Sequence, residues 1–322
     1  MHARKGVAGD PCRAPAGMRI CSYSVEHGPP RLGVQCGDVI LDLGRYSHLH
    51  EGERVPPDML AFIGAGTVVW RHADDLCSRF TAELGSHDLA QDAEAGLAYP
   101  ADRVRWHAPI PRPAKDIFCL GQNYAAHAAE HGNPPPPAPI YFTKPPTTVI
   151  GPDDVIPYPN GLTTRFDWEV ELGVIIGRRG KDIPEQRALD YVFGYTIFND
   201  VSARDLQFRT SQWFKGKALD GTCPMGPVIV TAEEIPDPQQ LRLHLSVNGT
   251  TKQDGSSSDM IFSVARIIAD LSAGMTLEPG DCISTGTPPG VGDGRNPPEY
   301  LKPGDVMEAE IERIGVLRNP VR

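Results

Sequence analysis

Glycine and proline recur along this whole chain, 33 and 32 times in 322 residues. Both residues interrupt regular helices and are typical of tight turns. Their density argues against a helical bundle, a coiled coil and a collagen-like repeat, and it favours a turn-rich β protein. A hydrophobic content of 40% with 22% charged residues is ordinary for a globular chain, so disorder is excluded as the main property. The length allows one large domain or two smaller ones.

The net charge limits which partners this protein can bind, and the cysteines indicate the compartment in which it works. The formal net charge is −10, and a chain this acidic repels phosphate backbones, so we expect no nucleic acid as partner. No run approaches about 18 apolar residues, so we expect no membrane partner and no transmembrane helix. The seven cysteines are scattered without a CxxC motif, which argues against a disulfide framework or a zinc site. These features together predict a cytoplasmic protein.

Composition along the chain predicts two regions. Residues 1–17 carry basic residues without an apolar core, which indicates a disordered leader rather than a secretion signal. Residues 18–107 mix short strands and helices and predict a small α+β N-terminal domain. Residues 108–114 are proline-rich and predict a linker. In residues 115–322 most sequence patterns are typical of β-strands, and these residues form the predicted second domain.

Hydrophobic periodicity places the individual elements. Alternating or β-branched runs predict strands, and the Asn248-Gly249 pair predicts a two-residue hairpin turn. Apolar residues at helical spacing, closed by Gly274, predict one amphipathic helix near 261–271. The expected strands are 19–23, 31–36, 39–43, 116–120, 140–143, 168–176, 191–199, 241–247 and 306–314, and the further expected helices are 57–63 and 68–84.

Three acidic residues form a candidate cation site. Glu169 and Glu171 are two residues apart in a predicted strand, so their side chains lie on one face, with Asp167 alongside. Clustered carboxylates repel each other, and a cation relieves that repulsion. The alternative is a solvated face of an antiparallel strand. Asp200 ends the next strand and either completes a three-carboxylate set or caps the helix expected at 201–207.

A histidine and a glutamate form a candidate acid–base pair. His127 and Glu130 are spaced i, i+3 in an alanine-rich segment that Gly132 ends, so they share one helix face. The carboxylate would orient the imidazole and raise its basicity. The alternatives are an exposed surface pair, or His131 as the relevant histidine. Lys217 is a further candidate, against the alternative of an ordinary surface lysine.

Seven segments, in this order, resemble the fumarylacetoacetate hydrolase family. The resemblance extends from about Lys115 to Val316, and residues 18–97 resemble the smaller N-terminal domain of many bacterial members. The sequence departs from the usual pattern at Ala126, where many members have Asp, and in the proline run 134–137. The matching segments are Gly121–Tyr124 with His127 and Glu130, Phe142–Pro145, Asp167–Glu171, Asn199–Asp205, Lys215–Lys217, Cys223–Gly226 and Thr285–Gly292.

The resemblance implies a fold, a metal site and an assembly. The family fold is a mixed β-sandwich roll, mostly β with α, and members usually form homodimers. The resemblance implies Mg²⁺ or Mn²⁺ (Ca²⁺ in crystals) on Glu169, Glu171 and Asp200. It also implies a His127–Glu130 dyad in a lid, a catalytic Lys217, and substrate contacts from Tyr124, Arg204, Gln207, Gly286 and Thr287.

The resemblance further implies chemistry on a small keto acid. The leading expectation is hydrolysis of a carbon–carbon bond in a 2,4-dioxo acid of the acylpyruvate, fumarylpyruvate or fumarylacetoacetate type. His127 would activate water, and Lys217 would stabilise the oxyanion. The alternatives on the same site are decarboxylation of oxaloacetate and enol–keto isomerisation of a 2-hydroxymuconate-type acid, as in aromatic-acid degradation. A non-catalytic keto-acid binder is the remaining alternative.

Overall fold

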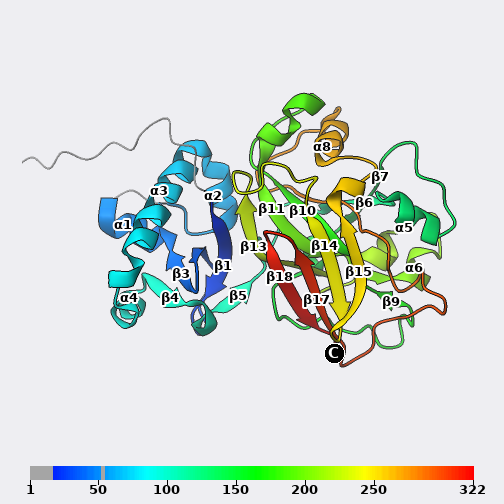
Figure 1. Cartoon of the computed structure of the whole chain (residues 1–322), viewed down its shortest axis with the longest axis horizontal. Helices are drawn as coiled ribbons and strands as arrows, with labels where there is room; N and C mark the ends of the chain where they lie inside the picture. The colour runs from blue at the N-terminus through cyan, green and yellow to red at the C-terminus, as the bar shows by residue number, and fades with distance from the viewer. Residues whose placement is uncertain (1–16, 52–54) are drawn as a thin grey trace, which may run out of the picture.

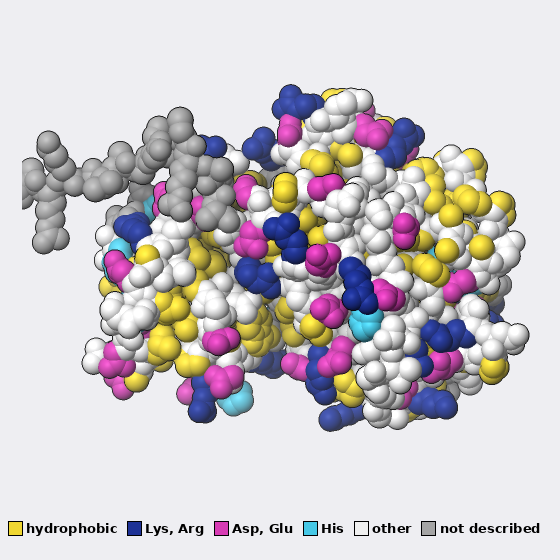
Figure 2. All heavy atoms as spheres, in the orientation of Figure 1, with side chains coloured by type: hydrophobic (Ala, Val, Ile, Leu, Met, Phe, Trp, Pro, Cys, Tyr) yellow, Lys and Arg dark blue, Asp and Glu magenta, His cyan; other side chains and the backbone are white. Residues whose placement is uncertain are grey.

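The computed structural model describes residues 17–51 and 55–322 (Figure 1). The leader predicted over 1–17 therefore lies outside the described residues, apart from Gly17. Among the described helices, none is both long enough and apolar enough to cross a membrane. On the face drawn in Figure 2, acidic and basic side chains are interspersed, and the described basic side chains form no continuous patch.

The N-terminal part combines a small set of strands with four helices (blue to cyan in Figure 1). The predicted strands and the two predicted helices are confirmed, and two further short helices follow Asp42 and Asp88, whose carboxylates accept backbone N–H groups of Arg45 and Ala90. The elements are β1 (Arg19–Ser24), β2 (Arg31–Cys36), β3 (Val39–Asp42), α1 (Leu43–Glu51), α2 (Met59–Ala65), α3 (Thr67–Glu83), α4 (Leu89–Ala95), β4 (Ala98–Pro100) and β5 (Arg105–His107).

The rest of the chain is mainly β, as expected from its sequence. Its helices are α5 (Ala125–Glu130), α6 (Arg204–Gln207), α7 (Phe214–Lys217) and α8 (Val264–Ser272). Its strands are β6 (Ile117–Gly121), β7 (Ile140–Lys144), β8 (Val149–Ile150), β9 (Phe166–Asp167), β10 (Val170–Ile176), β11 (Val192–Asn199), β12 (Ser202–Ala203), β13 (Cys223–Thr231), β14 (Arg242–Val247), β15 (Thr250–Ser256), β16 (Cys282–Ser284), β17 (Val306–Ile311) and β18 (Gly315–Pro320).

One large mixed sheet runs through both parts of the molecule. Its order is β4-β3-β2-β1-β13-β11-β10-β16-β6-β7, with β5 on β1 and β8 on β13. Two of its pairings, β16 with β6 and β13 with β8, are parallel. Strand β1 pairs with β13, so the sheet is continuous across the predicted linker, and the division into two domains stays a prediction.

The four-stranded sheet β15-β14-β17-β18 packs against this large sheet. Met307, Ala309 and Ile311 of β17 are buried while Glu308 and Glu310 are exposed, so the predicted alternation is confirmed. The hairpin between β14 and β15 turns at Asn248-Gly249, both with positive φ, as a two-residue loop of this type requires.

Helix α8 and strand β10 differ in their patterns of buried residues. In α8, Val264, Ile267, Ile268 and Leu271 form one buried stripe, and the Ser263 hydroxyl accepts the N–H of Arg266 as a cap. Every residue of β10 is buried, because this strand is covered on both faces.

Several predicted boundaries are wrong by a few residues. The strand expected over 306–314 ends at Ile311, because residues 312–314 turn the chain into β18, and the helix expected near 261–271 begins at Val264, after its Ser263 cap. The strand expected from Trp168 begins at Val170, because the Asp167 carboxylate accepts the Trp168 N–H and holds the backbone in a local bend. The helix expected from 201 begins at Arg204, because Ser202 and Ala203 first pair with β9. Asp200 therefore caps no helix.

Candidate active site

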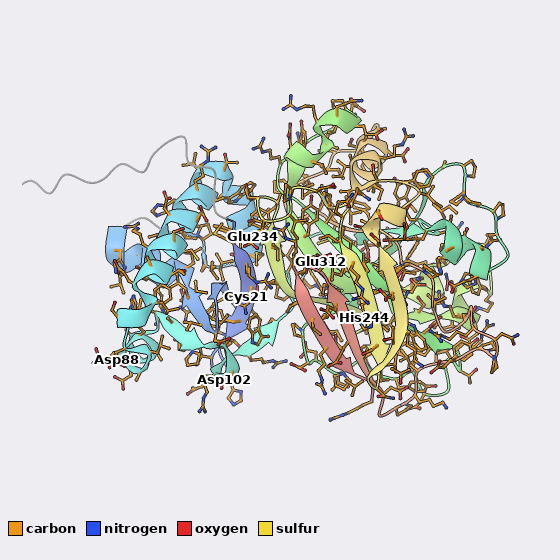
Figure 3. All side chains as sticks on the ribbon, viewed as in Figure 1. Cys21, Asp88, Asp102, Glu234, His244 and Glu312 are labelled. Carbon is orange, nitrogen blue, oxygen red and sulfur yellow. The ribbon has the colours of Figure 1, made fainter. Side chains whose placement is uncertain are left out.

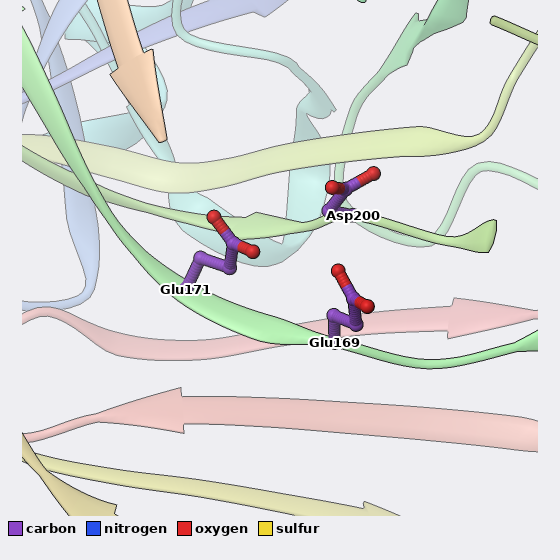
Figure 4. A group of neighbouring side chains, drawn as sticks. All are labelled: Glu169, Glu171 and Asp200. Carbon is purple, nitrogen blue, oxygen red and sulfur yellow. The ribbon is translucent and has the colours of Figure 1, made fainter. Parts of the chain in front are cut away.

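Three buried carboxylates from two neighbouring strands meet at the end of β10. Glu169 and Glu171 precede and open β10, and Asp200 directly follows its antiparallel partner β11. One oxygen of each lies within 4.8 Å of the other two, and all three side chains point toward one another in Figure 4. The alternative of a solvated strand face is excluded, since all three are buried.

Two basic side chains, Lys217 and Arg204, balance part of this negative charge. Lys217 Nζ lies 2.7 Å from both Glu169 Oε2 and Asp200 Oδ2. The guanidinium of Arg204 contacts the other oxygen of Glu169 at 2.6 Å and also binds Asp167 at 2.8 Å. Asp167 therefore pairs with Arg204 and is not a member of the three-carboxylate group.

Glu171 is held only by neutral donors. Its Oε2 accepts the hydroxyl of Ser284 at 2.6 Å and the backbone N–H of Gly286 at 2.8 Å. Burial, followed by the charges of Asp200 and Glu169, raises the pKa of Glu171 to about 8. Burial alone would also raise the pKa of Glu169, but Lys217 and Arg204 outweigh it and lower that pKa. A divalent cation would favour the ionised form of Glu171 and so offset the cause of this raised pKa.

His127 and Glu130 form a hydrogen-bonded pair on helix α5. Nδ1 of His127 lies 3.1 Å from Glu130 Oε2, and the other carboxylate oxygen accepts the N–H of Gly290 at 2.7 Å. His127 is 5% exposed, so the alternative of an exposed surface pair is excluded. Because Nδ1 faces the carboxylate, Nε2 is the ring nitrogen left for a substrate or a water molecule.

Glu169 and Glu171 of the three-carboxylate group line one cavity together with His127. Of the residues expected at the site, Arg204, Gln207, Lys217 and Thr287 also line it, and its apolar wall includes Leu120, Phe142, Phe208 and Trp213. The Thr287 hydroxyl is already engaged, since it donates to Val170 O and accepts from Gln253. Tyr124 and Gly286 are not part of this lining, and their contact with substrate stays a prediction.

Some residues of the site were not predicted from the sequence. Lys144 is completely buried, with Nζ 2.8 Å from Asp200 Oδ1 and 3.2 Å from Val201 O. Its segment Phe142–Pro145 was part of the family resemblance, which was the available signal. Trp213, whose ring lies 5.6 Å from that of Phe142, carried no such signal.

The chain is similar to known proteins over most of its length. Residues 116–322 match the family model described as fumarylacetoacetate (FAA) hydrolase C-terminal. An oxaloacetate tautomerase of Bacillus subtilis (strain 168) is 44% identical over 288 residues, 88% of this chain and 92% of that protein. A mitochondrial oxaloacetate tautomerase of Xenopus laevis is 38% identical, covering 94% of this chain and 90% of that protein.

A solved structure extends the likeness to the whole fold. The fumarylacetoacetate hydrolase of psychrophilic Exiguobacterium antarcticum superposes with a TM-score of 0.77 at 38% identity, covering 95% of this chain and 99% of that one. The chain therefore belongs to the fumarylacetoacetate hydrolase family. Members of this family are enzymes that act on small molecules and typically use a divalent metal, for which this chain has the buried carboxylates.

Proposed function

We propose that this protein is a divalent-metal-dependent enzyme that interconverts the enol and keto forms of a small 2-oxo dicarboxylic acid of the oxaloacetate class. The observation that carries the proposal is that a histidine held by a carboxylate lines the same cavity as Glu169 and Glu171, two members of the three-carboxylate group. The two oxaloacetate tautomerases, similar over about nine-tenths of the chain, favour this reaction over the others of the family.

Glu169, Glu171 and Asp200 fit a hard divalent cation. All three offer oxygen ligands, which suit Mg²⁺ or Mn²⁺ rather than zinc. Glu171 is buried next to Asp200 and Glu169, and among the described residues its hydrogen-bond donors are neutral, so the three carboxylates together are the structural reason for expecting a cation there. Such an ion would hold the 2-oxo acid and act as a Lewis acid toward its oxygen.

The chain's own residues supply proton transfer and orientation. His127, held by Glu130, exchanges a proton with the substrate through Nε2. Gln207 accepts from Arg204 through its amide oxygen, so its amide N–H groups remain as donors for a substrate carboxylate. Lys217 places an ammonium group beside the carboxylates, where it offsets negative charge that develops on the substrate.

Hydrolysis of a 2,4-dioxo acid is the second candidate. The His127–Glu130 pair is equally suited to remove a proton from water, and Lys217 then stabilises the oxyanion formed at the attacked carbonyl. The similar Exiguobacterium protein is named a fumarylacetoacetate hydrolase, which favours this reading. The products would be pyruvate or a related keto acid and a carboxylate.

A substrate panel with Mg²⁺ or Mn²⁺ decides between these reactions. Fresh enol-oxaloacetate, acetylpyruvate, fumarylpyruvate and a 2-hydroxymuconate-type diene are followed by ultraviolet absorbance, pyruvate release and CO₂. Faster ketonisation of oxaloacetate without CO₂ supports the tautomerase. Pyruvate from the acylpyruvates supports the hydrolase, and CO₂ from oxaloacetate supports a decarboxylase. If none of these substrates is turned over, the result would support the alternative that the protein binds keto acids without catalysis.

The same panel applied to His127→Ala tests the acid–base role. Removing a general base costs about 10²–10⁴ in rate. We expect a loss of this size with Mn²⁺ binding retained, and full activity of the variant would contradict the role given to His127.

The proposal includes a homodimer in the cytoplasm. The resemblance to the family supports the dimer, and the six described cysteines, all free, support a reducing compartment. Light scattering coupled to gel filtration measures the oligomeric state directly, and a monomer would contradict this part.

A further inference from the structure

A second histidine lies beside the first in the same cavity. His131 directly follows helix α5, and its ring centroid lies 5.1 Å from that of His127 with the two rings perpendicular. Its side chain is 15% exposed and lines the cavity together with the carboxylates. The proposed tautomerase function uses only one of these two imidazoles.

A carboxylate also lies near His131. Its Nδ1 lies 3.9 Å from Oδ2 of Asp293, a carboxylate whose other oxygen binds Arg165 and accepts the hydroxyl of Tyr300 at 2.6 Å. Arg165 and Tyr300 therefore hold one oxygen of Asp293, and its other oxygen lies near the imidazole of His131 without a hydrogen bond. The cavity is thus lined by two histidines, each with a carboxylate nearby.

One loop fixes both carboxylates. Gly290 donates to Glu130, and the backbone N–H groups of Gly292 and Asp293 donate to the buried Asp167. Asp167 in turn accepts a hydrogen bond from Arg204, a residue that lines the cavity, so the loop is connected to the site through Asp167. The carboxylates near the two imidazoles consequently belong to, or are held by, the same short segment.

Two acid–base groups suit a reaction that exchanges protons at two atoms. Keto–enol interconversion moves one proton at C3 and another at the oxygen on C2, whereas activation of water needs one base. Glu130 holds Nδ1 of His127, which leaves its Nε2 for the substrate. Nδ1 of His131 lies 3.9 Å from Asp293, beyond hydrogen-bond distance, and its ring lines the same cavity.

We propose that His131, beside His127 in the cavity, is a second acid–base residue of the site and exchanges the proton at C3 of the substrate, while His127 exchanges the proton at the C2 oxygen. This inference rests on the proposed tautomerase function. Toward the enol, neutral His131 removes a C3 proton, the C–H electron pair becomes the C2=C3 bond, and the carbonyl π pair moves to oxygen, which takes the Nε2 proton of His127 in its imidazolium form. The proton on His131 then returns to His127, so no other reactant is consumed, and the reverse direction exchanges the roles.

The charges around His131 agree with a neutral base. Burial, followed by His127 and Arg204, lowers the pKa of His131, while Glu169 and Asp293 oppose that shift. The neutral imidazole is therefore the prevailing form near neutral pH.

The test compares His131→Gln and His131→Ala with the control variant His244→Gln. His244 lies on strand β14, where its Nε2 contacts the Thr251 hydroxyl, and it is not part of the cavity (Figure 3). Ketonisation of fresh enol-oxaloacetate with Mg²⁺ is measured for each protein, together with Mn²⁺ affinity and the melting temperature.

We expect both His131 variants to lose about 10²-fold or more in kcat with Mn²⁺ affinity unchanged. Added imidazole should restore part of the activity of His131→Ala, which a purely structural role would not produce. Wild-type activity in His131→Gln, or a loss that imidazole leaves unchanged in His131→Ala, overturns the role of His131 alone. A wild-type protein that does not accelerate the reaction overturns the proposed function and this inference together.

Discussion

Nζ of Lys144 lies 2.8 Å from Oδ1 of Asp200, and both side chains are completely buried. Lys217 contacts the other oxygen of the same carboxylate, so Asp200 is held between two ammonium groups. Lys144 lies on β7 and Asp200 follows β11, strands far apart in the large sheet. This contact therefore links the far edge of that sheet to the candidate metal site.

Replacing Lys144 by methionine should strongly destabilise the protein. Removing one partner of a buried ion pair leaves the other charge uncompensated, which costs about 3–5 kcal/mol. We expect a loss near the lower end, about 3 kcal/mol, because Lys217 still contacts Asp200. Urea denaturation in the presence of a chelator measures the free energy of unfolding.

Lys115→Met is the matched control for this experiment. Lys115 also pairs with two carboxylates, Glu278 and Asp281, each at 2.9 Å, but its side chain is 35% exposed. Glu278 is exposed but Asp281 is buried, so this variant should lose more than the ~0–1 kcal/mol of an exposed pair and less than Lys144→Met, whose two groups are both completely buried. Equal losses in the two variants would contradict the special role of the buried pair.

Local sequence patterns predicted most individual elements of the fold. The hairpin at Asn248-Gly249 and the buried stripe of α8 are signals contained in a few neighbouring residues, and both are confirmed. Helices α1 and α4 were not predicted, because each is short and their residues form no clear apolar stripe. The order of strands in the sheet could not be predicted from local patterns, because pairings such as β1 with β13 join residues about two hundred positions apart.

The residues of the candidate site also fall into a predicted group and a group that was not predicted. Glu169, Glu171 and Asp200 were predicted because their spacing and the strand ends are visible in the sequence, and the structure places them together. Lys144 and Asp293 were not predicted as site residues. Their importance arises from contacts with residues 56 and 162 positions away, Asp200 and His131, which no local pattern encodes.

Asp200→Asn should abolish tight binding of Mn²⁺. An amide removes one of three negative charges from the proposed ligand set, and the loss should exceed the roughly 10–100-fold that removal of an outer partner of a ligand costs. Calorimetric titration of the metal-free protein with Mn²⁺ measures the affinity. Asp254→Asn, at an exposed carboxylate paired with Arg242, should titrate like the wild type. An unchanged affinity in Asp200→Asn would contradict the assigned metal site.

His107 should make the stability of the fold sensitive to acid. Burial, followed by the charge of Arg105, lowers the pKa of His107 below its usual 6.5, and Nε2 lies 2.8 Å from the Ser24 hydroxyl. As the pH falls below 6.5 the unfolded chain takes up the proton first, so the free energy of unfolding decreases. Denaturation from about pH 7.5 to about pH 5 should show a steeper loss in the wild type than in His107→Gln. Parallel curves would contradict this assignment.

Gly216→Ala should disturb the site through the backbone. A Cβ at Gly216 would lie 2.4 Å from the backbone nitrogen of Gln207 and 2.6 Å from the carbonyl oxygen of Ala203, and neither can move as a flexible side chain would. Helix α7, which carries Lys217, must then move away from α6, which carries Arg204 and Gln207.

We expect Gly216→Ala to lose about 1–3 kcal/mol of stability, as overpacked positions do, and to lower activity because Lys217 and Gln207 move apart. Gly64→Ala is the matched control, since its Cβ would meet nothing within 4 Å and it lies in helix α2. There alanine should be neutral or stabilise the protein by up to about 1 kcal/mol. Denaturation curves and the substrate panel measure both effects, and a Gly216→Ala protein as stable and active as Gly64→Ala would show that α6 and α7 can separate without cost.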